Sequence, residues 1–122
     1  MAIAMLINRT KPTGVTPTSG SGIGEWEYTT YSSKVYLTKY IGGGGDIYVP
    51  EQFTISGTIY NTQIGDNRYG NSVANVFGGH RGITSVTIPE NISFTCASMN
   101  GMFDGCSNLK YVNLGNRYVY NL

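Results

Sequence analysis

Apolar side chains recur at alternate positions in several short stretches of this chain, which is the spacing of half-buried β-strands. The segment from Glu25 to Ile41, EWEYTTYSSKVYLTKYI, is rich in β-branched and aromatic residues. Its second half divides into two alternating sets, Val35, Leu37 and Lys39 on one side and Tyr36, Thr38 and Tyr40 on the other. The pattern predicts two strands joined by a turn near Ser32 and Ser33.

Four consecutive glycines, Gly42 to Gly45, interrupt this β pattern. They do not satisfy G-x-G-x-x-G, and no Walker lysine follows them, so they predict a turn rather than a phosphate-binding loop. The next stretch, DIYVP, again alternates, with Ile47 and Val49 on one side and Asp46, Tyr48 and Pro50 on the other. We expect a further strand there, and a mainly β chain without a long helix.

A repeat occupies the C-terminal half of the chain. The segment VANVFGGHRGITSVTIP (residues 73–89) aligns without a gap with MNGMFDGCSNLKYVNLG (residues 99–115), at a constant offset of 26. An incomplete earlier copy starts at Asp46, where Ile47 and Val49 match Val86 and Ile88 at a separation of 39. That separation requires an insertion of about thirteen residues around ISGTIYNTQIGDNRYG.

Each copy is expected to form one short strand and a returning turn, which together bury an apolar face only when another copy stacks on them. The paired phenylalanines, Phe77 and Phe103, would fill the space between copies. The paired glycines, Gly79 and Gly105, would allow the backbone to turn at positive φ. The predicted repeat core consists of Phe77, Ile83, Val86, Ile88, Asn91, Phe103, Cys106, Leu109, Val112 and Leu114.

The stretches MFDGCSNLKYVNLG and ITSVTIPENI resemble the BspA-type leucine-rich repeats, in which F-x-x-C-x-x-L-x-x-[VI]-x-[IL]-P recurs. Ile83-x-x-Val86-x-Ile88-x-x-Asn91 also fits the pattern L-x-x-L-x-L-x-x-N, where the asparagine caps backbone groups inside the turn. The resemblance covers about residues 46–116 and implies a short leucine-rich-repeat-like β-solenoid. The family also implies adhesion to host molecules, or a structural role in phages.

The first 45 residues show no such resemblance. Residues 1–24 include RTKPTGVTPTSGSGIG, a composition typical of an arm or linker, so we expect an extended arm followed by one β domain over residues 25–122. The hairpin within residues 25–41 is expected to cap one end of the solenoid. The apolar run near Met1 is short and has no preceding basic region, which favours neither a secretory signal nor membrane insertion.

Composition narrows the function. The net charge is only +1 and the eight basic residues are scattered, so the chain offers no electrostatic surface for nucleic acid. His80 is the only histidine and aligns with Cys106, which favours a semi-buried packing role over catalysis. A cluster of His80, Cys96 and Cys106 lacks both metal-ligand spacing and a fourth ligand, so we expect two free thiols, no metal and no cofactor.

With catalytic, metal and nucleic-acid sites disfavoured, the remaining candidate for function is a binding surface on the predicted repeat sheet. The strand pattern places an uncharged, tyrosine-bearing strip on the outer face of the predicted repeat sheet, and tyrosine suits recognition of proteins or glycans. The residues predicted to bind are Tyr48, Ser85, Thr87, Tyr111 and Asn113. Further tyrosines outside the strip, Tyr69, Tyr118 and Tyr120, are additional candidates; an ordinary polar sheet face is the alternative interpretation.

Few repeat copies and an open last strand predict that another subunit covers the stack, so we expect a homo- or hetero-oligomer. The leading hypothesis is a non-enzymatic structural protein of a large assembly. Its most plausible form is a phage virion component, such as a decoration, fibre or tail protein, with the N-terminal arm as anchor. The alternative is an adhesin module at the bacterial cell surface that binds a host protein or glycan.

Overall fold

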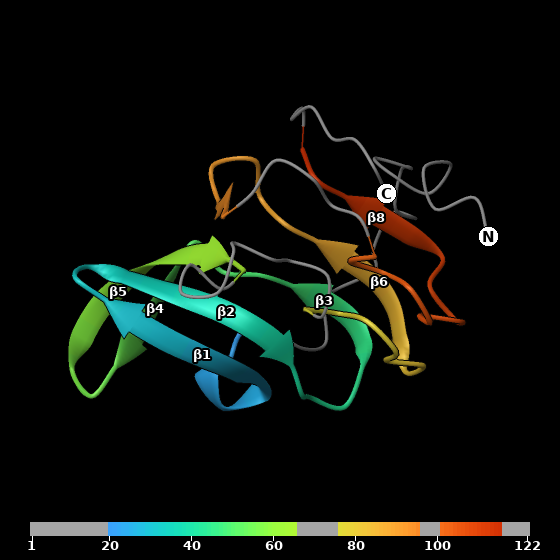
Figure 1. Cartoon of the computed structure of the whole chain (residues 1–122), viewed down its shortest axis with the longest axis horizontal. Helices are drawn as coiled ribbons and strands as arrows, with labels where there is room; N and C mark the ends of the chain where they lie inside the picture. Colours follow the sequence, from blue (N-terminus) through green and yellow to red (C-terminus); the bar gives the residue numbers. More distant parts are fainter. Residues whose placement is uncertain (1–19, 66–75, 96–100, 116–122) are drawn as a thin grey trace.

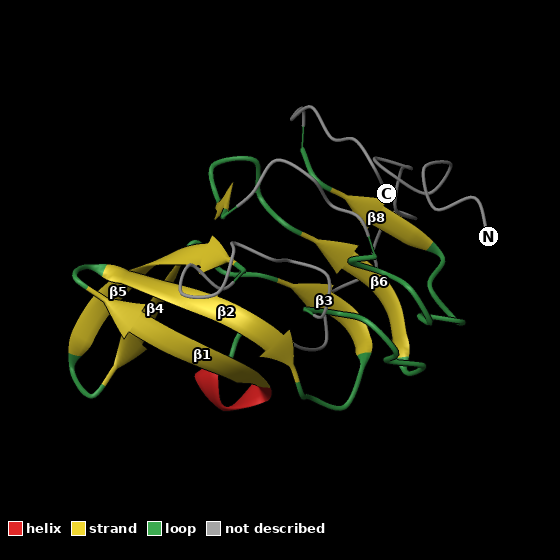
Figure 2. Ribbon diagram, viewed as in Figure 1, coloured by secondary structure: helices red, strands yellow, loops and turns green. Residues whose placement is uncertain are grey.

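The structure, a computed structural model, describes residues 20–65, 76–95 and 101–115, and these residues are mainly β (Figures 1 and 2). The elements are η2 (Ile23–Glu25), β1 (Trp26–Tyr31), β2 (Lys34–Tyr40), β3 (Gly45–Tyr48), β4 (Gln52–Ile55), β5 (Thr58–Ile64), β6 (Ile83–Thr87), β7 (Ser93–Phe94) and β8 (Tyr111–Asn113). The larger sheet has the order β1-β2-β5-β4, with β7 paired to β5, and the smaller sheet has the order β3-β6-β8. Neither sheet closes on itself.

Strands β1 and β2 form the predicted antiparallel hairpin, with the turn at Ser32, whose φ is 57°. The register shifts between Glu27 and Tyr28, because β2 carries one extra residue, Thr38, at that point. This bulge reverses the alternation beyond Leu37. Lys39, which was predicted to share a face with Leu37, is therefore exposed, and Tyr40 is buried instead.

A second hairpin is formed by β4 and β5; β5 lies within the segment that the repeat alignment predicted to be an insertion, and β4 lies mostly before it. It turns at Ser56 and Gly57, whose φ values are 50° and 84°. The pairing of β5 with β2 is parallel, from Lys34 opposite Asn61 to Leu37 opposite Ile64. The inserted residues thus provide the strand that joins the first hairpin to the rest of the larger sheet.

The smaller sheet is parallel, and its register is the one that the sequence alignment implies. Ile47 lies opposite Val86, a separation of 39 residues, and Val86 lies opposite Val112, a separation of 26. The three side chains are buried and point toward the same core. The separation between β3 and β6 is larger than that between β6 and β8, and the β4–β5 hairpin lies in the longer connection.

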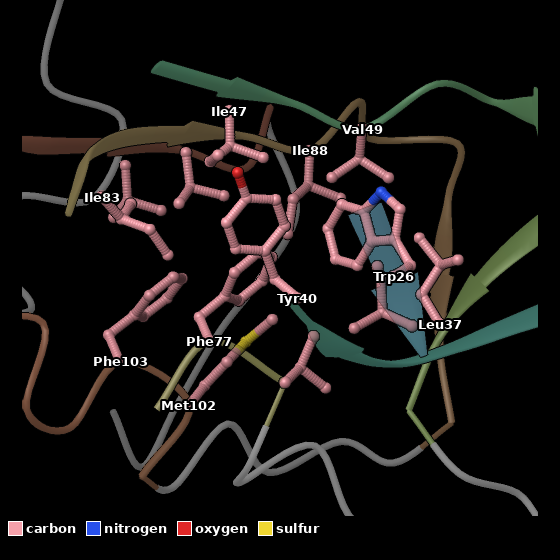
Figure 3. Packing of buried hydrophobic residues seen from close by; sticks show 14 of the residues in the cluster. Trp26, Leu37, Tyr40, Ile47, Val49, Phe77, Ile83, Ile88, Met102 and Phe103 are labelled. Atoms are coloured by element: carbon pink, nitrogen blue, oxygen red, sulfur yellow. The ribbon is translucent and has the colours of Figure 1, made fainter. Parts of the chain in front are cut away.

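One apolar cluster lies between the two sheets, and aromatic rings run through it (Figure 3). Phe77 stacks on Phe103 with ring centroids 5.5 Å apart and meets Trp26 edge to face at 5.7 Å. Trp26 in turn contacts Tyr40 at 5.1 Å. The first hairpin therefore packs its own aromatic side chains directly against the repeat segment.

Nine of the ten residues predicted for the repeat core are buried in this cluster, and Asn91 is not. Asn91 is exposed because the chain turns sharply after β6, where the Ile92 N–H donates to the Pro89 carbonyl at 3.0 Å. The turn places Ile92 in the core and leaves Asn91 outside. The predicted role of Asn91 as an internal cap is thus wrong.

The two glycines that the alignment paired lie next to each other. Gly79 and Gly105 both have a φ of 78°, and a Cβ atom added to Gly105 would lie 3.0 Å from the Gly79 Cα. Only glycine adopts this conformation readily and also permits such a close approach of two backbones. The matched turns of the two copies are therefore held directly one over the other.

Of the predicted arm, residues 20–24 are described. Gly20 is buried, its N–H donates to the Glu25 carboxylate and its carbonyl accepts a 2.8 Å hydrogen bond from Trp26 Nε1. This end of the arm therefore packs on the β domain. Residues 1–19, and with them most of the arm, lie outside the described residues, as do Cys96, Tyr69, Tyr118 and Tyr120.

Candidate interaction surface

The outer face of the β3-β6-β8 sheet carries the residues predicted to bind. Parallel pairing aligns them in two rows that cross the three strands, Asp46, Ser85 and Tyr111 in the first and Tyr48, Thr87 and Asn113 in the second. Because paired residues share a face, the register places all five predicted residues together with Asp46 on one side of the sheet. Their accessibility, however, differs between the rows.

The first row is largely closed. Ser85 is fully buried, and its hydroxyl donates a 2.6 Å hydrogen bond to Asp46 Oδ1, which also accepts the Thr84 hydroxyl at 3.0 Å. Thr84 is an extra residue in β6, so its hydroxyl and that of Ser85 converge on one carboxylate oxygen. The assignment of Ser85 to a binding surface is therefore wrong, because its only polar group is already used inside the protein.

The second row, which we call the display row, is open. It consists of Tyr48, which is 38% exposed, Thr87, which is half-buried, and Asn113, which is exposed. The Asn113 Oδ1 accepts the Gly115 N–H at 2.9 Å, which fixes the orientation of this carboxamide. An oriented amide, a hydroxyl and an accessible phenol ring are thus presented side by side.

The display row carries no charge, so its contribution to binding comes from ring area and directed hydrogen bonds. Tyrosine provides a large contact area at low conformational cost, and asparagine and threonine provide donors and acceptors. Such a combination suits a protein surface or a sugar, whereas a phosphate group requires positive charge. Tyr111, in the first row, is half-buried and borders this surface.

His80 is tied to the backbone through both ring nitrogens. The Gly82 N–H donates to Nδ1 at 3.1 Å, so Nδ1 is unprotonated and Nε2 carries the hydrogen that it donates to the Gly42 carbonyl at 2.8 Å. The ring also lies against Tyr40, with centroids 5.0 Å apart, and is half-buried. These contacts link the glycine turn before β3 to the turn before β6, which is a structural role.

Cys106 is a buried free thiol whose Sγ donates to the Phe77 carbonyl at 3.0 Å. Burial raises the pKa of this thiol, the backbone N–H of His80 partly offsets that effect, and the negative charge of Asp104 adds to it. A protonated, enclosed thiol is a poor nucleophile and a poor metal ligand. Within residues 20–65, 76–95 and 101–115, no group of three or more His, Cys, Asp or Glu side chains is placed to hold a metal ion.

The most accessible aromatic residue among the described residues is not one of those predicted to bind. Tyr31, at the end of β1, is 71% exposed, and Tyr28 in the same strand is 38% exposed. Ile59 in β5 is 60% exposed. The stretch EYTTYSS places Tyr31 beside a turn, but the position of β1 at the edge of the sheet has no local signal in the sequence.

Comparisons of the chain with protein-family models, curated proteins and solved structures find no match. In the part of the chain that the structure describes, no helix is long and apolar enough to cross a membrane.

Proposed function

We propose that this protein is a non-enzymatic subunit of a large assembly, built on stacked coils of the BspA-type leucine-rich-repeat kind. The coil assignment draws on contacts between the two aligned segments, which follow one another along the chain at nearly constant separation. These are Gly79 N–H to the Asp104 carbonyl at 2.7 Å, Asn108 Nδ2 to the Arg81 carbonyl at 2.7 Å and Lys110 N–H to the Thr84 carbonyl at 2.8 Å. Each of these hydrogen bonds joins a residue of one aligned segment to a residue at or next to the equivalent position of the other segment.

The observation that carries the proposal is the end of the stack at β8. β8 pairs only with β6, and no other strand of the described residues lies along its second edge. The end of a stack of repeats presents unpaired backbone N–H and C=O groups unless a cap or a neighbour pairs with them. At the opposite edge of this sheet, β3 likewise pairs only with β6 among the described strands, while Trp26 of the first hairpin packs against Phe77.

Within such an assembly the most fitting role is that of a phage virion component, with residues 1–24 as anchor and the repeat segment presented outward. The contacts of Gly20 with Trp26 and Glu25 fix the point at which the predicted arm joins the β domain. The display row provides the docking surface. A bacterial surface adhesin is the second candidate, because the same neutral row suits a host protein or glycan.

Particle association tests the assembly role. Particles are purified from the producing culture on a density gradient, and copies of the chain per particle are counted by quantitative mass spectrometry. We expect a fixed number of copies, and its loss when residues 1–19 are replaced by a Gly-Ser linker of equal length. A chain that stays in the soluble fraction, or varies in amount between preparations, would contradict the proposal.

Matched variants test the display row. Thr87→Glu places a charge in the row, and Thr54→Glu places the same charge on an exposed position of β4 in the other sheet. We expect Thr87→Glu to weaken binding of the purified chain to particles that lack it at least tenfold. Thr54→Glu should leave this binding unchanged. Binding of the wild-type chain to host cells, with absence from particles, would favour the adhesin instead.

A further inference from the structure

Strand β1 forms one edge of the larger sheet (Figure 1). It pairs with β2 along one side, and no strand of the described residues pairs with its other side. Its six residues, WEYTTY, contain no proline and no lysine, and Glu27, next to the bulge, is the one charged residue, so the stretch Tyr28 to Tyr31 carries no residue that commonly protects an edge. β1 is therefore an accessible template for a further strand.

The backbone groups that face outward can be identified from the pairing. Residues of an antiparallel pair alternate between bonding to the partner strand and facing away from it. The Ile41 N–H donates to the Glu25 carbonyl, which fixes the phase along β1. Glu27, Thr29 and Tyr31 thus bond to β2, and Tyr28 and Thr30 direct their N–H and C=O groups to the open edge.

We propose that a second copy of this chain pairs with β1 along this edge, in antiparallel orientation about a two-fold axis at Thr29. In this register Tyr28 lies opposite the partner subunit's Thr30, so the outward backbone groups of both strands meet. The next register toward Trp26 would need the Trp26 N–H, which already donates to the Ile23 carbonyl. A two-fold axis also makes the contact self-limiting, because each copy uses the same edge.

Charge favours the same register. Glu27 lies opposite the partner subunit's Tyr31, so the two carboxylates of the dimer stay apart and each faces a phenol that can donate a hydrogen bond. Tyr31 and Tyr28, the exposed aromatic residues of β1, each gain a cross-strand neighbour from the second copy. The result is one continuous sheet of two five-stranded halves, in which the path β4-β5-β2-β1, with β7 paired to β5, is joined to the same path reversed.

This inference deepens the proposed function and rests on it in one respect, that the chain works as an oligomeric subunit. It adds a surface and a partner that the stack end at β8 does not supply. Its test uses the purified chain alone, so a monomer in solution would overturn the β1 contact and leave particle association to be decided separately. Conversely, if the chain forms a dimer but does not associate with particles, the β1 contact is supported and the virion role is rejected.

A proline pair gives the first test. Thr30→Pro removes an N–H that faces the open edge of β1. Thr54→Pro is the matched control at the opposite edge of the same sheet, where β4 also directs the Thr54 N–H outward, because the Thr62 N–H donates to the Glu51 carbonyl and sets that phase. By light scattering after gel filtration we expect a dimer for the wild type and for Thr54→Pro, and a monomer for Thr30→Pro.

A charge pair tests the register without altering the backbone. Tyr31→Glu sets like charges opposite each other across the two-fold axis, whereas Tyr31→Lys sets a lysine opposite Glu27. We expect the dimer dissociation constant to rise at least tenfold in Tyr31→Glu and to stay equal or fall in Tyr31→Lys. Equal dissociation constants for both variants, a monomeric wild type, or dissociation caused by Thr54→Pro alone would each overturn the proposal.

Discussion

The ring of Phe77 stacks on the ring of Phe103, with centroids 5.5 Å apart and planes inclined by 13°. The two residues occupy equivalent positions 26 residues apart in the aligned segments. Phe77 also meets Trp26 at 5.7 Å, so it contacts the first hairpin on one side and the second repeat segment on the other. The pair therefore joins the N-terminal and C-terminal parts of the described core.

Truncating either ring should destabilise the whole domain. We expect Phe103→Ala to lower the free energy of unfolding by about 3–5 kcal/mol and Phe77→Ala to cost at least as much, because Phe77 has the additional aromatic neighbour. Urea titrations of the single and double variants measure both effects and their coupling. A coupling near zero between Phe77→Leu and Phe103→Leu would contradict a direct contact, which is expected to contribute about 0.5–1.5 kcal/mol.

Glycine substitutions test how closely the two repeat segments approach. Gly105→Ala and Gly57→Ala both place alanine at positive φ, at 78° and 84°, which costs about 1–2 kcal/mol in either case. A Cβ at Gly105 would also press on Gly79 at 3.0 Å, whereas the space around Gly57 is open. Thermal unfolding should therefore show a larger loss for Gly105→Ala than for Gly57→Ala. Equal losses would mean that the two turns can separate freely.

The buried thiol predicts a pH dependence. Because the pKa of Cys106 is raised by folding, the folded chain keeps this proton at pH values where the unfolded chain has lost it. The stabilisation is complete below the ordinary thiol pKa of about 8.5 and declines above it, by at most about 1.4 kcal/mol per pH unit.

Comparison with Cys106→Ala, in a Cys96→Ser background, isolates this effect because all other titrating groups are common to both proteins. The difference in free energy of unfolding should be constant between pH 7 and 8 and should narrow at pH 9 and 10. Residue-resolved alkylation should also show slow labelling of Cys106 until urea unfolds the chain. Parallel stability curves across this range would contradict the prediction.

The hydrogen bonds of His80 predict a single neutral tautomer, with the proton on Nε2. Long-range nitrogen–proton NMR spectra at pH 8 identify the protonated ring nitrogen directly. His80→Ala should lower the free energy of unfolding by about 1–3 kcal/mol, since two hydrogen bonds are lost. His80→Asn should cost less, because the amide oxygen can replace Nδ1 as acceptor for Gly82. A proton found on Nδ1 would exclude the observed geometry.

Local signals in the sequence predicted the parts of the fold that follow a regular alternation or a gapless repeat. The offset of 26 predicted the pairing of Val86 with Val112, and the separation of 39 predicted that of Ile47 with Val86. Both succeeded because strands of adjacent repeat copies are paired by equivalent residues.

Two of the failures lie beside a strand position that carries one extra residue. Thr38 shifts the phase so that Tyr40 rather than Lys39 enters the core, and Thr84 helps to bring Ser85 into a buried hydrogen bond. Single-residue bulges have no distinctive composition, so alternation alone cannot locate them. The parallel pairing of β2 with β5 was also missed, because contacts between distant segments have no local signal.

The turn at Ser56 and Gly57 stands at the far end of the β4–β5 hairpin from β8 in Figure 1, with open space around Gly57. A short epitope or a dye-labelled peptide inserted there would leave the display row, the β1 edge and the end at β8 untouched. Such a marker would let electron microscopy or immunogold labelling report where, and in which orientation, each copy sits in a particle.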